Sequence, residues 1–201
     1  VVTRSSVKGD PHDQPRSESP PLYRQTRGLF ADAVHREDAF DDFARQPLLP
    51  NKLSIAGPGA AWGDVDGDGD EDFFLGQGAG HAGALFVRNQ QGTFDRRTSP
   101  AMIFDSACED MGALFFDADA DGDLDLYVAS GGVECEPGDG KLRDRLYLND
   151  GSGNFSKAPD EALPEVRDSS SVVAAADFDR DGDLDLFVGG RVIPGQYPLA
   201  P

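Results

Sequence analysis

Apolar residues alternate with polar ones in short stretches along most of this 201-residue chain. In "LDLYVA" and "LDLFVG", at residues 124–129 and 184–189, leucine, aromatic and β-branched residues follow the period of two that is typical of strands rather than the 3.6 of a helix. Turn-forming residues separate the stretches, and the chain holds 24 Gly and 14 Pro. The pattern predicts an all-β fold of short strands.

Three pairs of apolar stretches are joined by an acidic loop of one design. "DVDGDGDED", "DADADGDLD" and "DFDRDGDLD" begin at residues 64, 117 and 177, each with Asp at five alternate positions and Gly at the sixth. Each unit therefore predicts a hairpin with the acidic loop at its tip. The first aspartates fall 53 and 60 residues apart, a spacing typical of propeller blades or repeat arrays.

A second hairpin follows the first two acidic units. "ALFVRNQQGTFDRR" at 84–97 and "RLYLNDGSGNFSKA" at 145–158 each combine an aromatic-bearing strand, a Gly turn and a strand with Phe. Two hairpins make a blade of four antiparallel strands, and "PLYRQTRGLFADA" near the amino terminus repeats the second hairpin alone. The predicted order is a half-blade at 22–33, a connector at 34–54, blades at 55–97 and 110–158, and a half-blade at 171–192.

The acidic loops predict three Ca²⁺ sites. Five carboxylates in one loop repel one another and cannot be buried unpaired, whereas Ca²⁺ accepts about six to eight oxygen ligands. Alternating side chains converge on one point, and the Gly at the sixth position permits the bend that brings back a fourth carboxylate. The predicted side-chain ligands are Asp64, Asp66, Asp68, Asp72, Asp117, Asp119, Asp121, Asp125, Asp177, Asp179, Asp181 and Asp185. The seventh residues, Asp70, Asp123 and Asp183, are predicted to offer carbonyl oxygens.

Two other structures could account for one such loop. A solvated acidic turn needs no ion, but it gives no reason for three loops in register. The loop of an EF-hand also opens with D-x-D-x-D-G, but that loop lies between two helices and needs a Glu at its twelfth position. Position twelve here is Leu75, Val128 and Val188, and the flanking residues have strand periodicity.

These motifs together resemble the FG-GAP or VCBS repeats of integrin-like β-propellers. The resemblance rests on D-x-D-x-D-G-D-x-D followed by L-[FY]-V, and on L-Y-x-N-[DGN]-G-x-G-x-F, over about residues 22–33 and 55–192. It implies Ca²⁺ in the loops at one face of each blade. "FDDFARQPLLPNKLS" and "GPGAAWGDVDGDGDEDFFLG" further resemble secreted VCBS proteins that often end in an ASPIC/UnbV domain, which does not follow in this sequence.

The blade count predicts an incomplete ring of about three blades, because closed propellers typically need about four to eight. Residues 1–20 read as a disordered tail or linker, since they contain almost nothing to bury. The segment starting at residue 191 breaks off where the next companion hairpin is expected, so the chain is either a fragment of a longer propeller or completes its open blade edge with a second copy.

Charge excludes two classes of partner. The formal net charge of −19 argues against nucleic acid and against anionic membranes. No apolar run approaches the 18 or so residues of a membrane span, and the amino terminus lacks both an initiator Met and a signal-peptide pattern, so an upstream segment is expected.

Signals for catalysis are weak. "GAGHAG" at 78–83 matches G-x-G-x-x-G, but a strand follows it instead of the helix that a phosphate site needs, so it predicts a turn. His12, His35 and His81 are scattered, and Trp62 is predicted in a strand core. A short helix is predicted around Phe40 and Phe43, ending before Pro47, within a connecting loop. "NFS" at Asn154 is a glycosylation sequon only in a suitable host.

Cys108 and Cys135, the two cysteines of the chain, lie at nearly equal distances before and after the middle acidic loop. In an antiparallel hairpin they should face each other, so the sequence predicts a disulfide, with two buried free thiols as the alternative. A disulfide fits an oxidising, extracellular compartment.

The leading functional hypothesis is a Ca²⁺-binding extracellular or cell-surface module with a structural, adhesion or assembly role. Its expected partners are a protein or glycan ligand at the cell surface or matrix, and other copies through open blade edges. The competing hypothesis is a part of a larger secreted propeller enzyme, such as a hydrolase, lyase or oxidoreductase.

Overall fold

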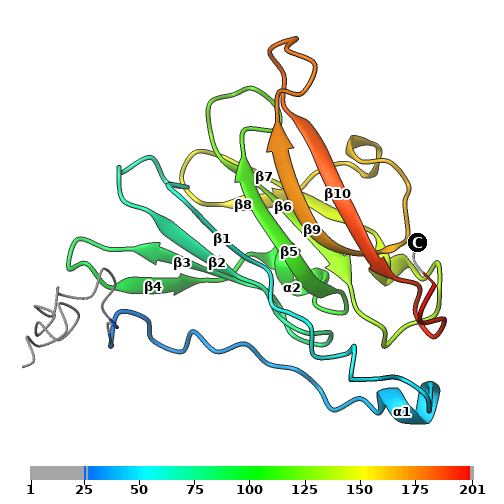
Figure 1. Ribbon diagram of the computed structural model, residues 1–201. Helices are drawn as coiled ribbons and strands as arrows, with labels where there is room; N and C mark the ends of the chain where they lie inside the picture. Colours follow the sequence, from blue (N-terminus) through cyan, green and yellow to red (C-terminus); the bar gives the residue numbers. More distant parts are fainter. Residues whose placement is uncertain (1–24, 26, 200–201) are drawn as a thin grey trace, which may run out of the picture.

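The chain folds into three antiparallel sheets that stand side by side like the blades of a fan (Figure 1). The computed structural model describes residue 25 and residues 27–199. The first sheet contains β1 (Ala60–Gly63), β2 (Asp72–Leu75), β3 (Ala84–Arg88) and β4 (Phe94–Arg97). The second contains β5 (Glu109–Phe116), β6 (Asp125–Gly131), β7 (Arg145–Asn149) and β8 (Phe155–Lys157). The third contains β9 (Ser169–Ala176) and β10 (Asp185–Val192).

The strand order within the sheets confirms the predicted blade architecture. Each of the first two sheets runs in sequence order with all neighbours antiparallel, and the third is a single hairpin. β1, β5 and β9 are the strands through which neighbouring sheets meet, so they form the inner edge of the fan. The described residues therefore make two full blades and one half-blade, and they do not close a ring.

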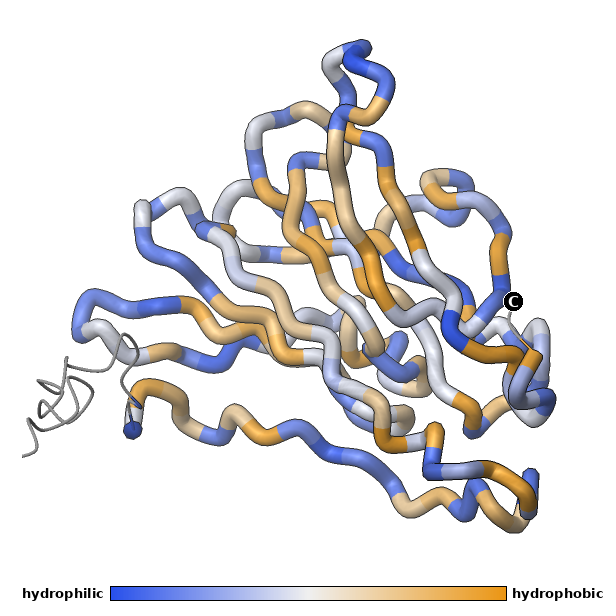
Figure 2. The backbone as a smooth tube through the Cα atoms, in the orientation of Figure 1, coloured by the Kyte–Doolittle hydropathy of each residue, from blue (hydrophilic) through white to orange (hydrophobic). Residues whose placement is uncertain are grey.

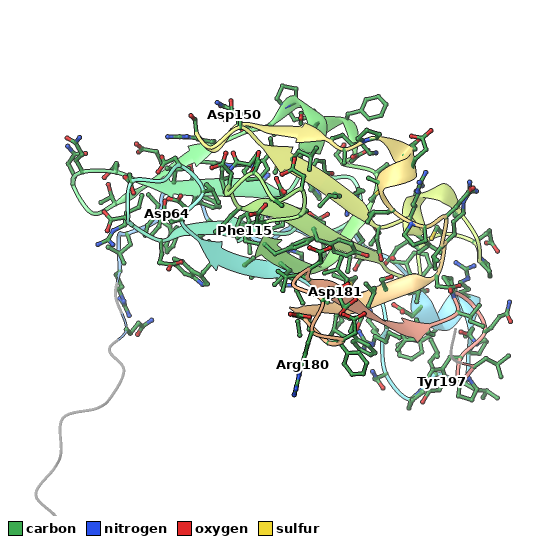
Figure 3. The ribbon with its side chains drawn as sticks, turned by 90° about the horizontal axis from the view of Figure 1, so that it is seen from above. Asp64, Phe115, Asp150, Arg180, Asp181 and Tyr197 are labelled. Atoms are coloured by element: carbon green, nitrogen blue, oxygen red, sulfur yellow. The ribbon has the colours of Figure 1, made fainter. Side chains whose placement is uncertain are left out.

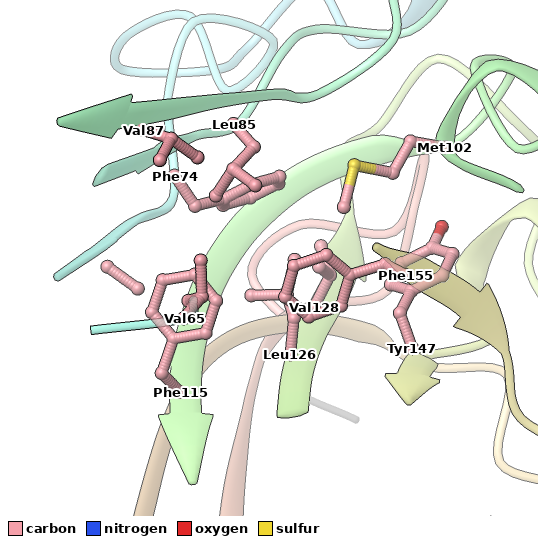
Figure 4. Packing of buried hydrophobic residues seen from close by; sticks show 11 residues of the cluster. Val65, Phe74, Leu85, Val87, Met102, Phe115, Leu126, Val128, Tyr147 and Phe155 are labelled. Carbon is pink, nitrogen blue, oxygen red and sulfur yellow. The ribbon is translucent and has the colours of Figure 1, made fainter. Parts of the chain in front are cut away.

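The core lies between the blades. Side chains of the first and second blades interdigitate in one buried cluster, which Figure 4 shows from close by: Ala61, Val65, Phe74, Leu85, Val87, Met102, Phe115, Leu126, Val128, Tyr147 and Phe155. A second cluster joins β6 and β7 to the third sheet through Tyr127, Leu186 and Val188. In Figure 2 the strands carry most of the apolar residues and the loop tips are hydrophilic.

The middle blade is the only one of the three sheets covered on both faces by other sheets. Every residue of β6 is buried. β10 has almost the same sequence, but most of its residues are exposed or half-buried because one of its faces lacks a neighbouring sheet. Phe187 of β10 is consequently 68% exposed.

Glycines let the backbones of neighbouring inner strands come into direct contact. A Cβ on Gly59, the residue before β1, would lie 2.7 Å from the backbone carbon of Gly112 in β5. A Cβ on Gly112 would lie 2.9 Å from the carbonyl oxygen of Ser171 in β9. Both distances are shorter than van der Waals contact, so a larger residue at either position would push the sheets apart.

The connector before the first blade contains the predicted short helix, α1 (Asp42–Arg45). Asp41 caps it, since its side chain accepts a hydrogen bond from the Ala44 amide at 3.1 Å. The buried Asp42 carboxylate accepts hydrogen bonds from the Leu53 and Ser54 amides and from the Ser54 hydroxyl. The connector is thus a packed element.

Three other short helical segments lie outside the blades: α2 (Pro100–Phe104), which joins the two full blades, and the 3₁₀ turns Gly140–Leu142 and Asp160–Ala162. None of the helices in the described part of the chain is long and apolar enough to span a membrane.

The half-blade predicted at 22–33 begins outside the described residues, as do the tail at 1–20 and His12. In the described portion, Phe30 forms a single parallel bridge with Phe94 of β4, and the Phe94 amide donates to the Leu29 carbonyl at 2.9 Å. The Phe30 ring stacks on Phe94 with centroids 4.3 Å apart. This segment therefore packs along the outer edge of the first blade.

The predicted disulfide is not formed, and both thiols are free. The β5–β6 register sets Glu109 opposite Gly131 after a bulge, so the position across from Cys108 is near residue 132. Cys135 lies three residues further, in a loop whose carbonyls at Val133 and Cys135 accept hydrogen bonds from Arg45. The prediction assumed an unbroken hairpin, and the strand ends before it reaches Cys135.

Two predictions about single features have different outcomes. Trp62 is not a core residue: it is 55% exposed and packs on Phe73 at the outer face of the first blade. Its strand alternates, and Trp62 occupies an exposed position between buried Ala61 and Gly63. Residues 78–83 form a turn that leads directly into β3, as predicted.

Candidate metal centres in the three acidic loops

The three acidic loops lie along one rim of the fan, where the first two strands of each sheet meet (Figure 1). Figure 3 views this rim from above, with Asp64 of the first loop and Asp181 of the third labelled. Each loop is short because β1–β2, β5–β6 and β9–β10 are hairpins with direct antiparallel pairing up to the loop. The sites thus sit on rigid strand ends.

The backbone bend of each loop depends on positive φ values at its fourth and sixth residues. The sixth residues Gly69, Gly122 and Gly182 have φ between 90° and 102°, as the sequence predicted. The fourth residue is Gly67 in the first loop, but Ala120 and Arg180 in the other two, with φ of 62° and 65°. Ala120 and Arg180 thus have a left-handed backbone conformation that non-glycine residues seldom adopt.

In each loop the structure brings together the first, third and ninth aspartates. The triads are Asp64, Asp66 and Asp72; Asp117, Asp119 and Asp125; and Asp177, Asp179 and Asp185. Within a triad, one carboxylate oxygen of each residue lies within 4.8 Å of the others. That spacing suits ligands about 2.3–2.6 Å from a shared ion.

The fifth and seventh aspartates lie outside these triads. The carboxylates of Asp68, Asp121 and Asp181 each accept a hydrogen bond from the amide two residues later, at 2.9–3.0 Å. Asp70 forms an ion pair with Arg88 at 2.8 Å. Ligation by the fifth side chains, and by the carbonyls of Asp70, Asp123 and Asp183, stays a prediction.

The ninth aspartate anchors the loop to its blade. Asp72 accepts hydrogen bonds from the Val65 amide at 3.0 Å and from the Arg88 amide, on β3, at 2.8 Å. Asp125 does the same with the Ala118 amide at 2.9 Å and the Asn149 amide, on β7, at 2.8 Å. Both carboxylates are fully buried.

Burial also changes the pKa of the Asp72 and Asp125 carboxylates. Desolvation raises the pKa of Asp72 and of Asp125, the backbone hydrogen bonds partly oppose the shift, and the neighbouring loop aspartates add to it. Their negative charge is therefore destabilising as long as no cation offsets it.

The triads contain oxygens that no protein group satisfies. Asp66 Oδ1 and Asp117 Oδ1 are buried and have no hydrogen-bond partner. A buried carboxylate oxygen without a partner is unfavourable by about 1–3 kcal/mol or more, so such groups signal an ion or water. The donor set of each triad is all carboxylate oxygen, which fits a hard divalent cation.

Neighbouring blades support the loops through residues that the sequence analysis did not single out. Asn149 Nδ2 donates to the Val65 carbonyl of the first loop at 2.8 Å and to the Leu124 carbonyl of the second at 3.1 Å. Arg97 donates to the Ser152 carbonyl and lies 3.4 Å from Asp66 Oδ2. The N in the L-Y-x-N pattern was the available signal for Asn149; Arg97 had none.

Comparison with known proteins gives the same architecture. The family model for the FG-GAP-like repeat matches residues 41–128 and 133–188. The chain belongs to the FG-GAP-like repeat family. No curated protein matches it. The two matched segments of this FG-GAP-like protein include all three acidic loops, so the triads lie within its repeats.

Proposed function

We propose that this chain is a Ca²⁺-binding, extracellular β-propeller module with a structural, adhesion or assembly role. The observation that carries the proposal is the repeated aspartate triad on one rim, with buried Asp66 and Asp117 oxygens that lack any protein partner. Ca²⁺ would bind Asp64, Asp66 and Asp72 in the first loop and the equivalent aspartates in the other two. Its contribution would be to neutralise the carboxylates and lock each hairpin tip.

The experiment is a thermal melt of the chain with Ca²⁺, with Mg²⁺ and with excess chelator. We expect Ca²⁺ to raise Tm, because an ion that binds the folded state stabilises it by mass action, and Mg²⁺ to do less because it demands strict octahedral geometry. Asp117→Ala should remove one ion. Asp95→Asn, which removes the charge of an exposed carboxylate on β4, serves as control. An equal Tm under all three conditions contradicts the proposal.

An extracellular setting suits sites of this kind. Extracellular modules bind Ca²⁺ with dissociation constants of about 10⁻⁴–10⁻³ M, which match exposed loops with a few protein ligands and room for water. We expect a partner that is a protein or glycan at the cell surface or matrix. The exposed Trp62, supported by Phe73 and Phe30, is a rigid aromatic surface of the type that such ligands contact. Trp62→Ala should weaken ligand binding without changing the Ca²⁺ response.

Self-association is expected through β10. Its one paired neighbour among the described residues is β9, whereas the equivalent strands β2 and β6 each pair on both edges. A companion hairpin would complete the blade and cover Phe187, whether it comes from a second copy or from further chain. Light scattering at several concentrations separates the two: a mass that rises with concentration indicates a second copy.

The enzyme hypothesis has less support than the binding hypothesis. Both histidines of the described residues hold the connector in place: His35 lies 2.7 Å from Glu37 and 3.1 Å from the Gly76 carbonyl, and His81 lies 3.3 Å from Asp38. FG-GAP-like repeats are typically structural modules, and no observation here favours a particular reaction.

A further inference from the structure

A second kind of acidic site lies at the opposite end of the middle blade from its acidic loop. Glu109 is the first residue of β5, whereas the loop follows the last residue of that strand. The Glu109 side chain is only 3% exposed, and both of its carboxylate oxygens lack a hydrogen-bond partner. A carboxylate that is buried on both oxygens without a donor requires a proton or a cation.

The groups around Glu109 are mostly negative. Its carboxylate and that of Glu134 both lie over Gly132, where an added Cβ would overlap an oxygen of each. Glu37 and Asp110 add their charges from the connector and from β5. Burial and the adjacent Glu134 raise the pKa of Glu109 to about 9.

The basic groups nearby are already engaged. Asp110 is neutralised by Arg145 in a buried ion pair at 2.7 Å. Arg45 donates to the Val133 and Cys135 carbonyls and pairs with Glu136. His35 bonds to Glu37. No basic side chain in the described part of the chain is bonded to Glu109.

We propose that Glu109 and Glu134 form an additional divalent-cation site, which takes a hard ion such as Ca²⁺ or Mg²⁺ above Gly132. The site has two carboxylates that approach each other over Gly132, an oxygen-only donor set, and two Glu109 oxygens that no protein donor satisfies. Glu37 contributes negative charge at longer range. The bound ion would join β5 to the loop after β6, close to where that loop meets α1.

This site is not another copy of the repeated loop. Glu109 lies eight positions before Asp117, the first aspartate of its loop. The residues at the equivalent positions before the other two loops are Ala56 and Ser169. Ser169 instead donates its hydroxyl to the Gly132 carbonyl at 3.0 Å. The acidic pair therefore belongs to the middle blade alone.

Equilibrium dialysis of the full chain against Ca²⁺, with bound metal counted by elemental analysis, tests the proposal. Glu109→Gln keeps the shape of the side chain but removes its charge, and it should bind one ion fewer than the unmodified protein. Glu134→Gln should lose the same ion. Glu161→Gln, at an exposed acidic position in a 3₁₀ turn, is the matched control and should lose none.

The difference between these variants does not depend on the rim loops. If the loops bind no Ca²⁺, the loss of one ion in Glu109→Gln still supports the additional site, and the proposed function fails separately. An unchanged ion count in both Glu109→Gln and Glu134→Gln, each folded by circular dichroism, overturns the inference and assigns a shared proton to the pair. The same dialysis against Mg²⁺ identifies the preferred ion.

Discussion

The acidic loops at 117–125 and 177–185 have nearly the same sequence, but their surroundings differ. In the middle blade, Asp125 is buried and its carboxylate joins the loop to β7 through the Asn149 amide. In the half-blade, Asp185 is exposed, and its carboxylate receives a hydrogen bond from the Phe178 amide within the same hairpin. In a complete blade, the loop between the first two strands carries the acidic site, and the third strand fixes the ninth aspartate of that loop through a backbone amide.

The comparison teaches that the acidic motif and the geometry of the candidate ion site are separate properties. The sequence of a loop supplies its carboxylates, while the companion hairpin buries the ninth aspartate and fixes its rotamer. A loop without that hairpin must order its ligands when the ion arrives, which lowers affinity. We therefore expect the first two sites to bind Ca²⁺ more tightly than the third.

The largest effect should come from removing the buried ninth aspartate. Asp125→Ala leaves the Ala118 and Asn149 amides without acceptors, and each buried unpaired amide is unfavourable by about 1–3 kcal/mol. We expect a loss of about 2–5 kcal/mol in the free energy of unfolding. Asp185→Ala should lose less than half as much. Urea denaturation in excess chelator measures both without the contribution of the ion; equal losses would refute the comparison.

The next effect should come from Asn149, which links the first two loops. Asn149→Ala removes the hydrogen bonds to the Val65 and Leu124 carbonyls, and we expect a loss of about 1–3 kcal/mol. Calorimetric titration should show weaker Ca²⁺ binding at two sites and no change at the third. Asn154→Ala, at an exposed position of the same turn, is the control. Uniform weakening at all three sites would show that Asn149 acts on stability alone.

A smaller effect should appear as opposite pH dependences with and without Ca²⁺. Because the folded protein raises the pKa of Asp72 and Asp125, their contribution to stability is fully present below about pH 3.9 and is lost as pH rises through the folded values. The chelated protein should therefore lose stability from these groups as pH rises above about 4. With Ca²⁺, stability should rise over the same interval, since the ion needs ionised carboxylates.

Asp42 acts in the opposite direction and must be separated from this effect. Burial works to raise its pKa, but the hydrogen bonds from Ser54 and the nearby amides outweigh it, so its pKa is lowered and its contribution is lost as pH falls. Thermal melts of Asp125→Ala beside the unmodified protein isolate the loop contribution. Parallel pH profiles of the two proteins in chelator would contradict the assignment.

The smallest effect should come from the positive φ at the fourth loop position. Ala120→Gly relieves a left-handed conformation that is unfavourable for alanine by about 1 kcal/mol, and it gives the second loop the glycine that the first already has. We expect a small rise in Tm, with unchanged Ca²⁺ stoichiometry. Gly67→Ala in the first loop is the reciprocal variant and should lower Tm by a similar amount.

The sequence was sufficient to predict the features that depend on local pattern. Strand alternation and the repeated loops predicted the blades, and Gly69, Gly122 and Gly182 adopt the positive φ expected of them. Features that depend on register or on neighbouring sheets could not be predicted. A bulge between Asp110 and Gly112 and an early strand end separate the two cysteines.

The candidate sites show the same division. The first, third and ninth aspartates of each loop lie together, and nothing in the repeat distinguishes Asp125 from Asp185, because their burial depends on a hairpin that only one of them has. The Glu109 and Glu134 pair was also missed. Its residues are separated by the whole β5–β6 hairpin, and only the fold brings them over Gly132.

The contact of Gly59 with Gly112, and of Gly112 with Ser171, has a consequence for ring size. Because the inner strands touch at backbone distance, the distance between neighbouring blades is fixed at their inner edge. Further out, the aromatic and aliphatic residues packed between the blades set that distance. The difference between the inner and outer distances, over the radial length between them, sets the wedge angle between blades, and the wedge angle decides how many blades complete a circle. Two glycines thus help to set the symmetry of any assembly that this fan can enter.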